Sequence, residues 1–295
     1  MQERRLVAAP KDPTADVCAP AADGSLSQTL WLGLPIAALA LGFATAAFAE
    51  SHETIIVSHG YNEYDTLKYS PDDAHLAYVN PDAPVGGELS FATVGTFDSM
   101  NPYATGIGTP GVLSSYMYQD MMISTADEVG SSYCLLCTTL EYPESQDWVI
   151  FNIRDDVTFS DGTPMTAEDI LFSFNLLREQ GTPSYAQFVQ ANVETVEVLD
   201  PYRLKFTFKD GVPRLGLIST MGSLPAFPKH WYEETGARLD KSRLETGPGT
   251  GEYAIDSIDV GRQIVLKRNP DYWGTDVPFR KGTHNIDEVR LEFFG

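Results

Sequence analysis

Residues 148–177 are the stretch that most constrains the fold, because they predict a strand, a tight turn and a helix in immediate succession. Apolar side chains occupy both faces of residues 148–153, which is typical of a strand that is covered on both sides. The residues Ser160-Asp161-Gly162 then favour a turn. Thr166 has the position of a helix N-cap, and Asp169 follows it three residues later, as in a capping box. The stretch therefore indicates a fold of the α/β class.

The other elements follow from similar patterns. Apolar residues beside turn signals predict strands and two hairpins, at 55–57, 88–93, 193–198 with 204–209, and 253–260 with 263–268. A helix is expected over residues 113–122. Strands and helices mix without strict alternation, so we expect a mixed sheet rather than a purely parallel one.

The first 49 residues are interpreted as an export signal. Residues 30–49 are apolar and uncharged, and Ala47-Phe48-Ala49 has the small-x-small pattern of a signal peptidase site. An uncleaved anchor is the alternative, since about 20 apolar residues can just span a bilayer. We expect cleavage after Ala49 and a periplasmic location, because no later segment is apolar enough to span a membrane.

The end of the chain suggests that more sequence belongs to the protein. Residues 289–295 stop in the middle of an alternating strand pattern, with no turn or terminal helix after it. A sheet edge left in this way is a liability for a soluble protein. We therefore expect these 295 residues to be the front part of a longer protein.

Charge limits the partners. The formal net charge is −21, whereas nucleic-acid and anionic-lipid binding both require clustered basic residues. Peptides remain acceptable ligands, and cationic or zwitterionic solutes would be attracted by the field of the chain. Simple solubility is the alternative explanation of the negative charge.

No motif for catalysis or cofactor binding stands out. The glycines of 106–111 match GxGxxG, but no strand precedes them, as a dinucleotide site would need. The five histidines share no metal-ligand spacing. Cys134 and Cys137 form a CxxC that we interpret as a structural pair, with a disulfide or without one, rather than a redox site. We therefore expect no enzyme activity, no cofactor and no metal.

Four segments of the chain closely resemble a known family. They are 78–87 continuing to 95–102, then 148–174, 224–231, and 249–253 continuing to 268–274. Together they resemble the family 5 extracellular solute-binding proteins, which are the peptide-capturing components of ABC importers. The first and third segments are most similar to the Yej-type branch, associated with oligopeptide and microcin C uptake. Glu252 is a departure, because the family usually has proline there.

The resemblance implies a periplasmic-binding-protein-like fold of type II, in which two lobes close around a ligand. It implies that this chain is mostly lobe I and its small subdomain. Residues 50–100 and 196–295 would form lobe I, with a mixed sheet and helices, and residues 101–195 would form the subdomain. The second lobe is expected beyond residue 295 and would be absent here.

Residues 96–101 join a probable strand to a loop, which is the usual place for site residues on a rigid scaffold. The candidate ligand-binding residues are Thr96, Phe97, Asp98, Met100, Asn101, Tyr185 and Met221. Asp98 is a candidate partner for a peptide amino terminus, and Asn101 for backbone amides. The alternative is that both residues only shape a turn. Tyr185 corresponds to a tyrosine that related binders place near the ligand, and Met221 is expected near a hinge.

These expectations favour a monomeric periplasmic receptor that hands a peptide or peptide-like ligand to an inner-membrane ABC permease and its ATPase. One alternative is a receptor of the same fold for a metal chelate, a glycan or a cell-wall peptide. A secreted hydrolase is a third hypothesis, and it would need a reactive nucleophile.

Overall fold

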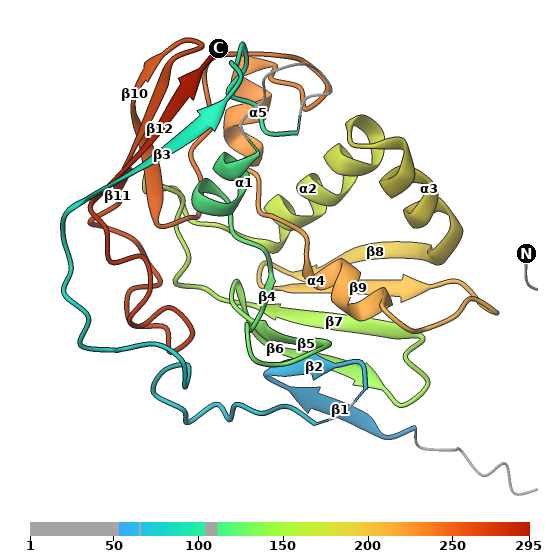
Figure 1. Cartoon of the computed structure of the whole chain (residues 1–295). Helices are drawn as coiled ribbons and strands as arrows, with labels where there is room; N and C mark the ends of the chain where they lie inside the picture. Colours follow the sequence, from blue (N-terminus) through green and yellow to red (C-terminus); the bar gives the residue numbers. More distant parts are fainter. Residues whose placement is uncertain (1–52, 65, 104–110) are drawn as a thin grey trace, which may run out of the picture. The chain divides into compact units, whose positions relative to one another are not determined.

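Three β-sheets organise the part of the chain that the structure describes (Figure 1). The structure, a computed structural model, describes residues 53–64, 66–103 and 111–295. These residues belong to one compact unit, 51–295. The predicted signal peptide and residues 104–110 of the GxGxxG stretch lie outside the described residues. Among the described helices, none is both long enough and apolar enough to cross a membrane.

The elements have the following bounds in chain order. They are β1 Ile55–Ser58, β2 Gly60–Asn62, β3 Glu88–Val94, α1 Val112–Met117, β4 Met122–Ser124, β5 Ser131–Cys134, β6 Cys137–Pro143, β7 Trp148–Ile153, α2 Ala167–Gln180, α3 Pro183–Asn192, β8 Val193–Asp200, β9 Arg203–Phe208, α4 Leu217–Gly222, α5 Lys229–Thr235, β10 Tyr253–Asp259, β11 Gln263–Arg268 and β12 Glu288–Phe294.

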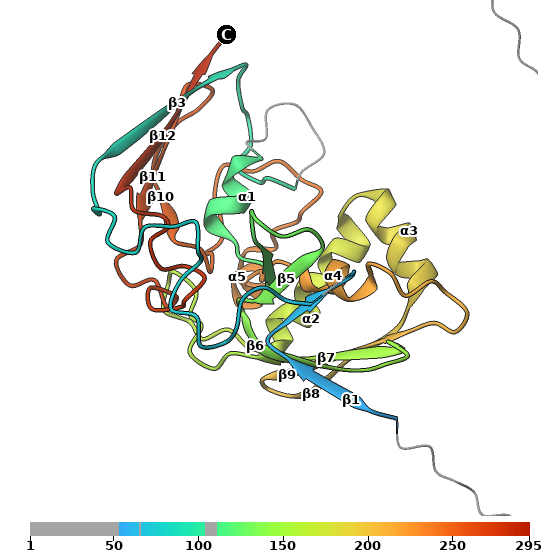
Figure 2. The same cartoon turned by 60° about the horizontal axis from the view of Figure 1, so that its bottom comes forward.

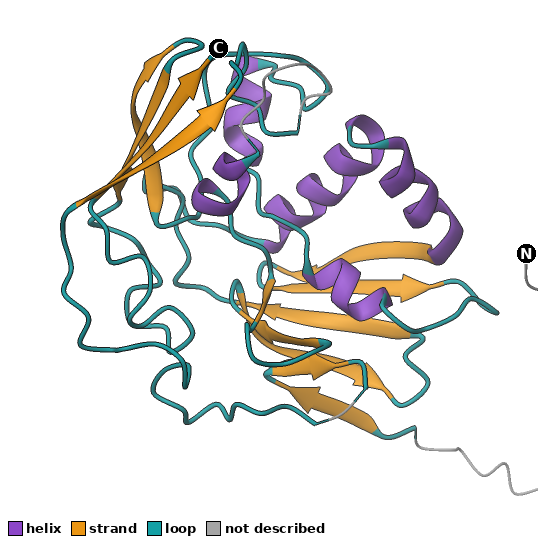
Figure 3. Ribbon diagram, in the orientation of Figure 1, coloured by secondary structure: helices purple, strands orange, loops and turns teal. Residues whose placement is uncertain are grey.

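The largest sheet has five antiparallel strands in the order β1-β6-β7-β9-β8. The strand predicted over 148–153 is confirmed as β7, which lies at the centre of this sheet. Val149 and Phe151 are fully buried there, because helices α2 and α3 cover one face of the sheet (Figures 1 and 3). The Phe174 ring of α2 contacts the Phe206 ring of β9, with 5.7 Å between centroids. Helix and sheet therefore share the first hydrophobic core.

Helix α2 begins as its sequence predicts. The Thr166 amide donates to Oδ2 of Asp169 at 2.9 Å, which completes the predicted capping box. Met165 and Ile170, on either side of this cap, are both fully buried. The helix ends before Gly181, where a Cβ atom would overlap a carbonyl oxygen of the preceding turn. Local chemistry therefore sets both ends of this helix.

A second sheet has the order β10-β11-β12-β3, and both predicted hairpins are confirmed, as β8–β9 and β10–β11. Strand β12 pairs antiparallel with β11 and parallel with β3. Figure 2 shows β3 and β12 side by side, although they come from opposite ends of the described chain. The inner face of this sheet packs against α1 and α5 and forms a second core, which includes Leu113, Tyr232, Leu266 and Leu291.

A short third sheet, β2-β5-β4, adjoins the five-stranded sheet. A disulfide joins Cys134, the last residue of β5, to Cys137, the first residue of β6. Both cysteines are buried, and their Cα atoms lie 4.9 Å apart. The pair therefore crosslinks the turn between two sheets, in a setting that suits a structural disulfide.

The structure corrects the helix expected over residues 113–122. Helix α1 ends at Met117, and Tyr118 already has an extended backbone. The amide of Met121 donates to the carbonyl of Leu224 at 3.0 Å, and Asp120 forms a β-bridge with Pro225. These distant partners satisfy the backbone better than another helical turn, so the apolar pattern continues into β4 instead.

The five-stranded sheet takes its strands from both sides of the expected division of the chain. The five-stranded sheet combines β1, from the predicted lobe I segment, with β6 and β7, from the predicted subdomain. The predicted boundary between residues 195 and 196 falls within β8. The strands on both sides of this boundary contribute to one hydrophobic core, and the division into lobe I and its subdomain stays a prediction.

Candidate functional site

An open cleft of about 440 Å³ gathers side chains from segments that are far apart in the sequence. It is lined by Tyr103, Ser114, Ser115, Tyr118, Gln119, Asp120, Ile123, Leu177, Tyr185, Ser223, Leu224, Pro225 and Arg280. A hollow of similar size lies elsewhere, against α2, α3 and β8, but its lining comes from that neighbourhood alone. Aromatic, hydroxyl and charged groups meet in the first cleft, which is the usual composition of a ligand site.

The extended stretch 118–120 forms one wall of the cleft, and two other segments hold its backbone. The carbonyl of Gln119 accepts from the amide of Ala226 at 3.2 Å, on one side. On the other side, the amide of Gln119 donates to Oγ1 of Thr250 at 3.0 Å. Asp120 therefore projects from a backbone that is fixed on both edges.

Two glycines make this arrangement possible. The amide of Gly251 donates to the carbonyl of Met117 at 2.8 Å. A Cβ atom at Gly249 would overlap that same carbonyl oxygen, and one at Gly251 would overlap the carbonyl oxygen of Tyr116. The Gly-Thr-Gly sequence is therefore required because two backbones touch directly at this point.

Asp120 is the unpaired charge of the cleft. Within the described residues its carboxylate has neither a hydrogen bond nor an ion pair. Burial raises the pKa of Asp120 to about 7, and the positive charge of Arg280 opposes this rise. Arg280 itself is engaged elsewhere, with its Nε atom 2.9 Å from Oε1 of Glu252.

Glu252 is the centre of a buried ionic cluster behind the cleft wall. Its side chain is only 4% exposed, and Nδ1 of His284 lies 3.3 Å from its Oε1 atom. These are close ion-pair contacts rather than well-aligned hydrogen bonds. Burial lowers the pKa of His284, although the Glu252 charge favours its protonated form. The cluster therefore balances the charge of Arg280 and leaves that of Asp120 uncompensated.

Three tyrosines, Tyr103, Tyr118 and Tyr185, also line the cleft. Tyr185, on α3, has a buried hydroxyl that finds no hydrogen-bond partner among the described residues. Burial raises the pKa of Tyr185 well above the usual 10.0 of tyrosine, so the hydroxyl remains protonated. Burial likewise raises the pKa of Tyr103, and the nearby Asp120 charge adds to this effect. The cleft lining thus combines tyrosine rings with the unpaired carboxylate of Asp120.

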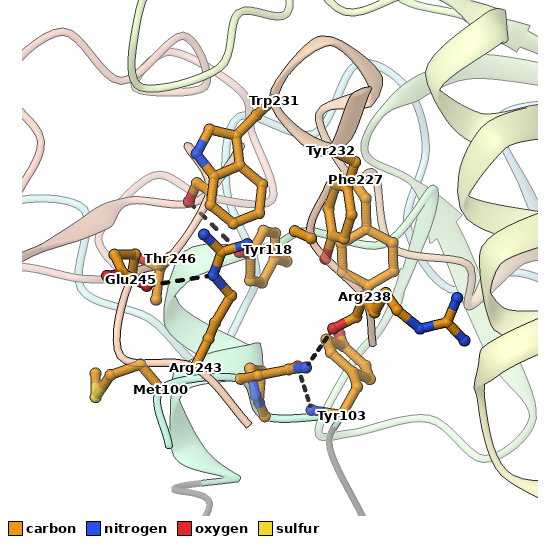
Figure 4. Close-up of a pocket in the computed structure, with 14 residues that line it drawn as sticks. Met100, Tyr103, Tyr118, Phe227, Trp231, Tyr232, Arg238, Arg243, Glu245 and Thr246 are labelled. Atoms are coloured by element: carbon orange, nitrogen blue, oxygen red, sulfur yellow. Dashed lines mark hydrogen bonds and ion pairs between the residues drawn. The ribbon is translucent and has the colours of Figure 1, made fainter. Parts of the chain in front are cut away.

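The site residues that the sequence predicted do not gather in one place. Tyr185 lines the cleft, whereas Met100 and Asn101 line a separate cavity of about 20 Å³ (Figure 4). In that cavity the guanidinium of Arg243 lies over the Trp231 ring, 4.7 Å from its centroid. The cavity is largely filled by these side chains, so it offers little room for a ligand.

The other four predicted residues are not part of the cleft lining. Phe97 is buried against the Phe293 ring at 4.8 Å, and Met221 is fully buried within α4. Thr96 is exposed and donates to the carbonyl of Gly261 at 3.3 Å. Asp98 is exposed, and it lines none of the cavities described above. The structure therefore brings only Tyr185 of this set into the cleft.

Asn101 is held by the chain itself. Its Nδ2 atom donates to the carbonyls of Arg238, Leu239 and Lys241 at 3.1, 2.9 and 3.1 Å. Its Oδ1 atom accepts from the amide of Tyr103 at 3.0 Å. The side chain thus organises two loops, in agreement with the alternative that it shapes the turn.

Sequence reasoning missed Asp120 and Arg280. Nothing in the sequence around Asp120 distinguishes it from a surface carboxylate after a helix. The departure at Glu252 was a usable signal, because a buried carboxylate in place of proline requires a cationic partner. Among the described residues, no three of the His, Cys, Asp and Glu side chains gather closely enough to hold a metal ion.

Comparison with solved structures shows the class of fold. The ABC transporter-associated periplasmic binding protein DppA from Helicobacter pylori, solved in complex with the peptide STSA, superposes with a TM-score of 0.56 at 21% identity. The superposition covers 72% of this chain and 43% of that protein. The fold is therefore that of the type II periplasmic binding proteins, as the resemblance implied.

The family follows from the sequence comparisons. Residues 135–295 match the middle region of the bacterial extracellular solute-binding proteins, family 5, and the chain belongs to this family. The peptidoglycan-binding protein YepA of Agrobacterium fabrum is 34% identical over 80% of this chain and 39% of its own length. The probable peptide-binding protein YejA of the same organism is 34% identical over 88% of this chain and 42% of its own length. The chain thus spans about two fifths of the length of these relatives.

Proposed function

We propose that this chain belongs to the periplasmic substrate-binding component of an ABC importer that captures peptides or peptide-like solutes. Membership of a solute-binding family is the observation that carries this proposal. The similarity to a probable peptide-binding protein and the fold of a peptide-bound receptor support peptides as the cargo. Its partners would then be a membrane permease and the associated ATPase.

The cleft has the properties that such a receptor needs. Its volume of about 440 Å³ falls in the range of small-molecule sites. Its described lining contains three serines but no histidine or cysteine, so it holds neither a serine–histidine nor a cysteine–histidine pair. We infer that the protein holds its ligand reversibly and catalyses no reaction.

A peptide derived from the cell wall is the second candidate ligand. The similarity to the peptidoglycan-binding protein YepA favours it specifically. Such peptides share the backbone groups of ordinary peptides, so the same polar wall serves both. They differ in end groups and in branching, which a binding assay can distinguish.

We further infer that residues 50–295 supply one wall of the site, and that closure on a ligand requires the remainder of a protein as long as its relatives. Export would remove residues 1–49. Mass spectrometry of the mature periplasmic protein should therefore find Glu50 as its first residue. A mature protein that retains residues 30–49 would instead support the membrane-anchor alternative.

Thermal unfolding of the full-length gene product, with and without candidate ligands, tests the function. A ligand that binds only the folded state raises stability by about 2.7 kcal/mol at a hundredfold excess over its dissociation constant. Tri-alanine, a muramyl tripeptide, a ferric chelate and an oligosaccharide should be compared at equal concentrations. Stabilisation by the chelate or the oligosaccharide alone would contradict the proposal, and cleaved product in the peptide sample would reveal a hydrolase.

A further inference from the structure

Arg280 is shared by two cavities. It lines the open cleft together with Asp120, and it also lines a second cavity, of about 160 Å³, together with Glu252. We propose that Glu252 is a positioning residue that holds the charge of Arg280 away from the cleft and thereby sets the selectivity of the cleft against anionic ligands. This inference rests on the proposed function, since it concerns which solutes the cleft admits.

Glu252 and Arg280 form a close and poorly solvated ion pair. The Oε1 atom of Glu252 lies 2.9 Å from Nε of Arg280 and 3.3 Å from Nδ1 of His284. The side chains of Glu252 and Arg280 are only 4% and 16% exposed, so water screens their attraction little. Burial lowers the pKa of His284, which leaves that ring neutral at neutral pH. Arg280 is therefore the cation that Glu252 compensates.

Two further cations line the second cavity, and neither lies within ion-pair distance of Glu252. Arg268 pairs with Asp287 instead, with 2.6 Å between its Nη2 atom and Oδ1 of the aspartate. Lys281 is exposed to solvent and forms no ion pair with the described residues. The carboxylate of Glu252 is thus not diverted from Arg280 by other basic side chains.

The backbone around this pair is held in place. The carbonyl of Glu252 accepts from the amide of Asn269 at 2.7 Å, which ties it to the segment that precedes Arg280. His284 has a φ of 53°, a left-handed conformation that residues other than glycine seldom adopt. Such strain persists only where the surrounding contacts hold a residue in place. A carboxylate that is fixed in this way also fixes the position of its cation.

The pair changes what the cleft presents to a ligand. The charge of Arg280 lowers the pKa of Asp120, yet burial prevails and the pKa stays raised. Glu252 weakens the field of Arg280 in the cleft, because two opposite charges 2.9 Å apart largely cancel at longer range. An arginine without this counterion would attract an anionic ligand group. The family usually has proline at this position, and proline has no charge with which to offset Arg280.

The pKa of the Asp120 carboxyl reports the field inside the cleft and needs no ligand. The exported protein is labelled with carbon-13 at the aspartate carboxyl carbons and titrated with acid, and the Asp120 resonance is identified by its absence from Asp120→Asn. Glu252→Gln should lower the pKa of Asp120 by about 1 or more, because an uncompensated positive charge nearby favours the ionised carboxylate. An unchanged pKa would overturn the inference.

Two further variants control this titration. Glu141 pairs with Arg203 at 3.2 Å outside the described cleft lining, so Glu141→Gln should leave the pKa of Asp120 as it is. The double variant Glu252→Gln/Arg280→Gln leaves neither charge of the pair unmatched, so it can be measured even where Glu252→Gln alone does not fold. It removes a pair without net charge, and Asp120 should keep its raised pKa. A further rise by about 1 or more would mean that Arg280 acts on the cleft independently of Glu252, which contradicts the inference.

A pair of peptides measures the selectivity itself. N-acetyl-Ala-Asn-Ala-amide and N-acetyl-Ala-Asp-Ala-amide differ by one negative charge, and both of their termini are blocked. The native protein should bind the asparagine peptide more tightly, and Glu252→Gln should move the ratio of the two dissociation constants toward the aspartate peptide by about tenfold or more. Equal weakening of both peptides, with the ratio unchanged, would reduce Glu252 to a support of the fold and refute the inference. If neither peptide binds the native protein, the proposed function fails and the titration of Asp120 decides the inference by itself.

Discussion

Replacement of Asn101 by alanine should destabilise the fold rather than abolish ligand binding. The amide nitrogen contacts three carbonyl oxygens, those of Arg238, Leu239 and Lys241, and the amide oxygen accepts from Tyr103. The side chain is 9% exposed, so water cannot replace these bonds without rearrangement. Because two N–H groups serve three acceptors, we count about three net hydrogen bonds. At about 1 kcal/mol each, the expected loss is about 3 kcal/mol.

Urea-induced unfolding measures this loss as a lower transition midpoint with an unchanged denaturant slope. Asn175→Ala, on a partly exposed side chain of α2 that makes no hydrogen bond in the structure, is the matched control and should change little. Asn101→Asp should be at least as harmful at neutral pH, because it sets a carboxylate against carbonyl oxygens. Its folded-state pKa would be raised, so part of the stability should return on acidification. Normal stability of Asn101→Ala together with lost peptide binding would refute the reasoning and restore Asn101 as a ligand residue.

Three further outcomes are expected. Burial raises the pKa of Asp120 from 3.8 to about 7, so the folded state retains a proton that the unfolded state releases, and stability should fall as pH rises between those values. Asp120→Asn should remove that fall. A pKa difference of about three corresponds to roughly 4 kcal/mol of stability, and solvent in the open cleft reduces this to roughly 2 kcal/mol. Urea unfolding at about pH 5 and pH 8 measures the pH-dependent change in stability. Glu252→Gln should cost about 3 kcal/mol, because Arg280 remains buried without its counterion, and the thermal midpoint should drop accordingly. Replacing Cys134 and Cys137 together by alanine should cost only about 2 kcal/mol, because the disulfide closes a very short loop, and reductant should lower the midpoint of the native protein by as much.

The elements that sequence predicted correctly are those whose determinants are local. Thr166 and Asp169 cap helix α2 within three residues of each other, and the hairpin turns contain their own turn residues. The helix predicted over 113–122 failed for the opposite reason. Its second half pairs with residues 224–226 and 250, whose proximity no local pattern reveals. The apolar pattern of residues 118–122 was thus compatible with a helix or with an extended chain, and hydrogen bonds to distant segments favoured the extended chain.

The site was harder to predict than the fold. The resemblance to the family suggested Tyr185, which lines the cleft, whereas Phe97 and Met221, suggested by their positions in the chain, are buried. Motif similarity does not separate residues that contact a ligand from those that support the loop carrying them. Asp120 gained its character only from burial, from the unpaired state of its carboxylate and from the compensation of Arg280 by Glu252. All three are properties of the assembled chain.

The disulfide has a practical consequence for following ligand capture. The sequence contains three cysteines, of which Cys18 lies in the predicted signal peptide and the other two are bonded to each other. A cysteine introduced at Ser115 or Ser223, both exposed at the rim of the cleft, would be the sole reactive thiol of residues 50–295. A fluorophore attached there would sense the change from water to bound solute. The native disulfide therefore leaves room for a single-site label, whose fluorescence would report whether a solute enters the cleft.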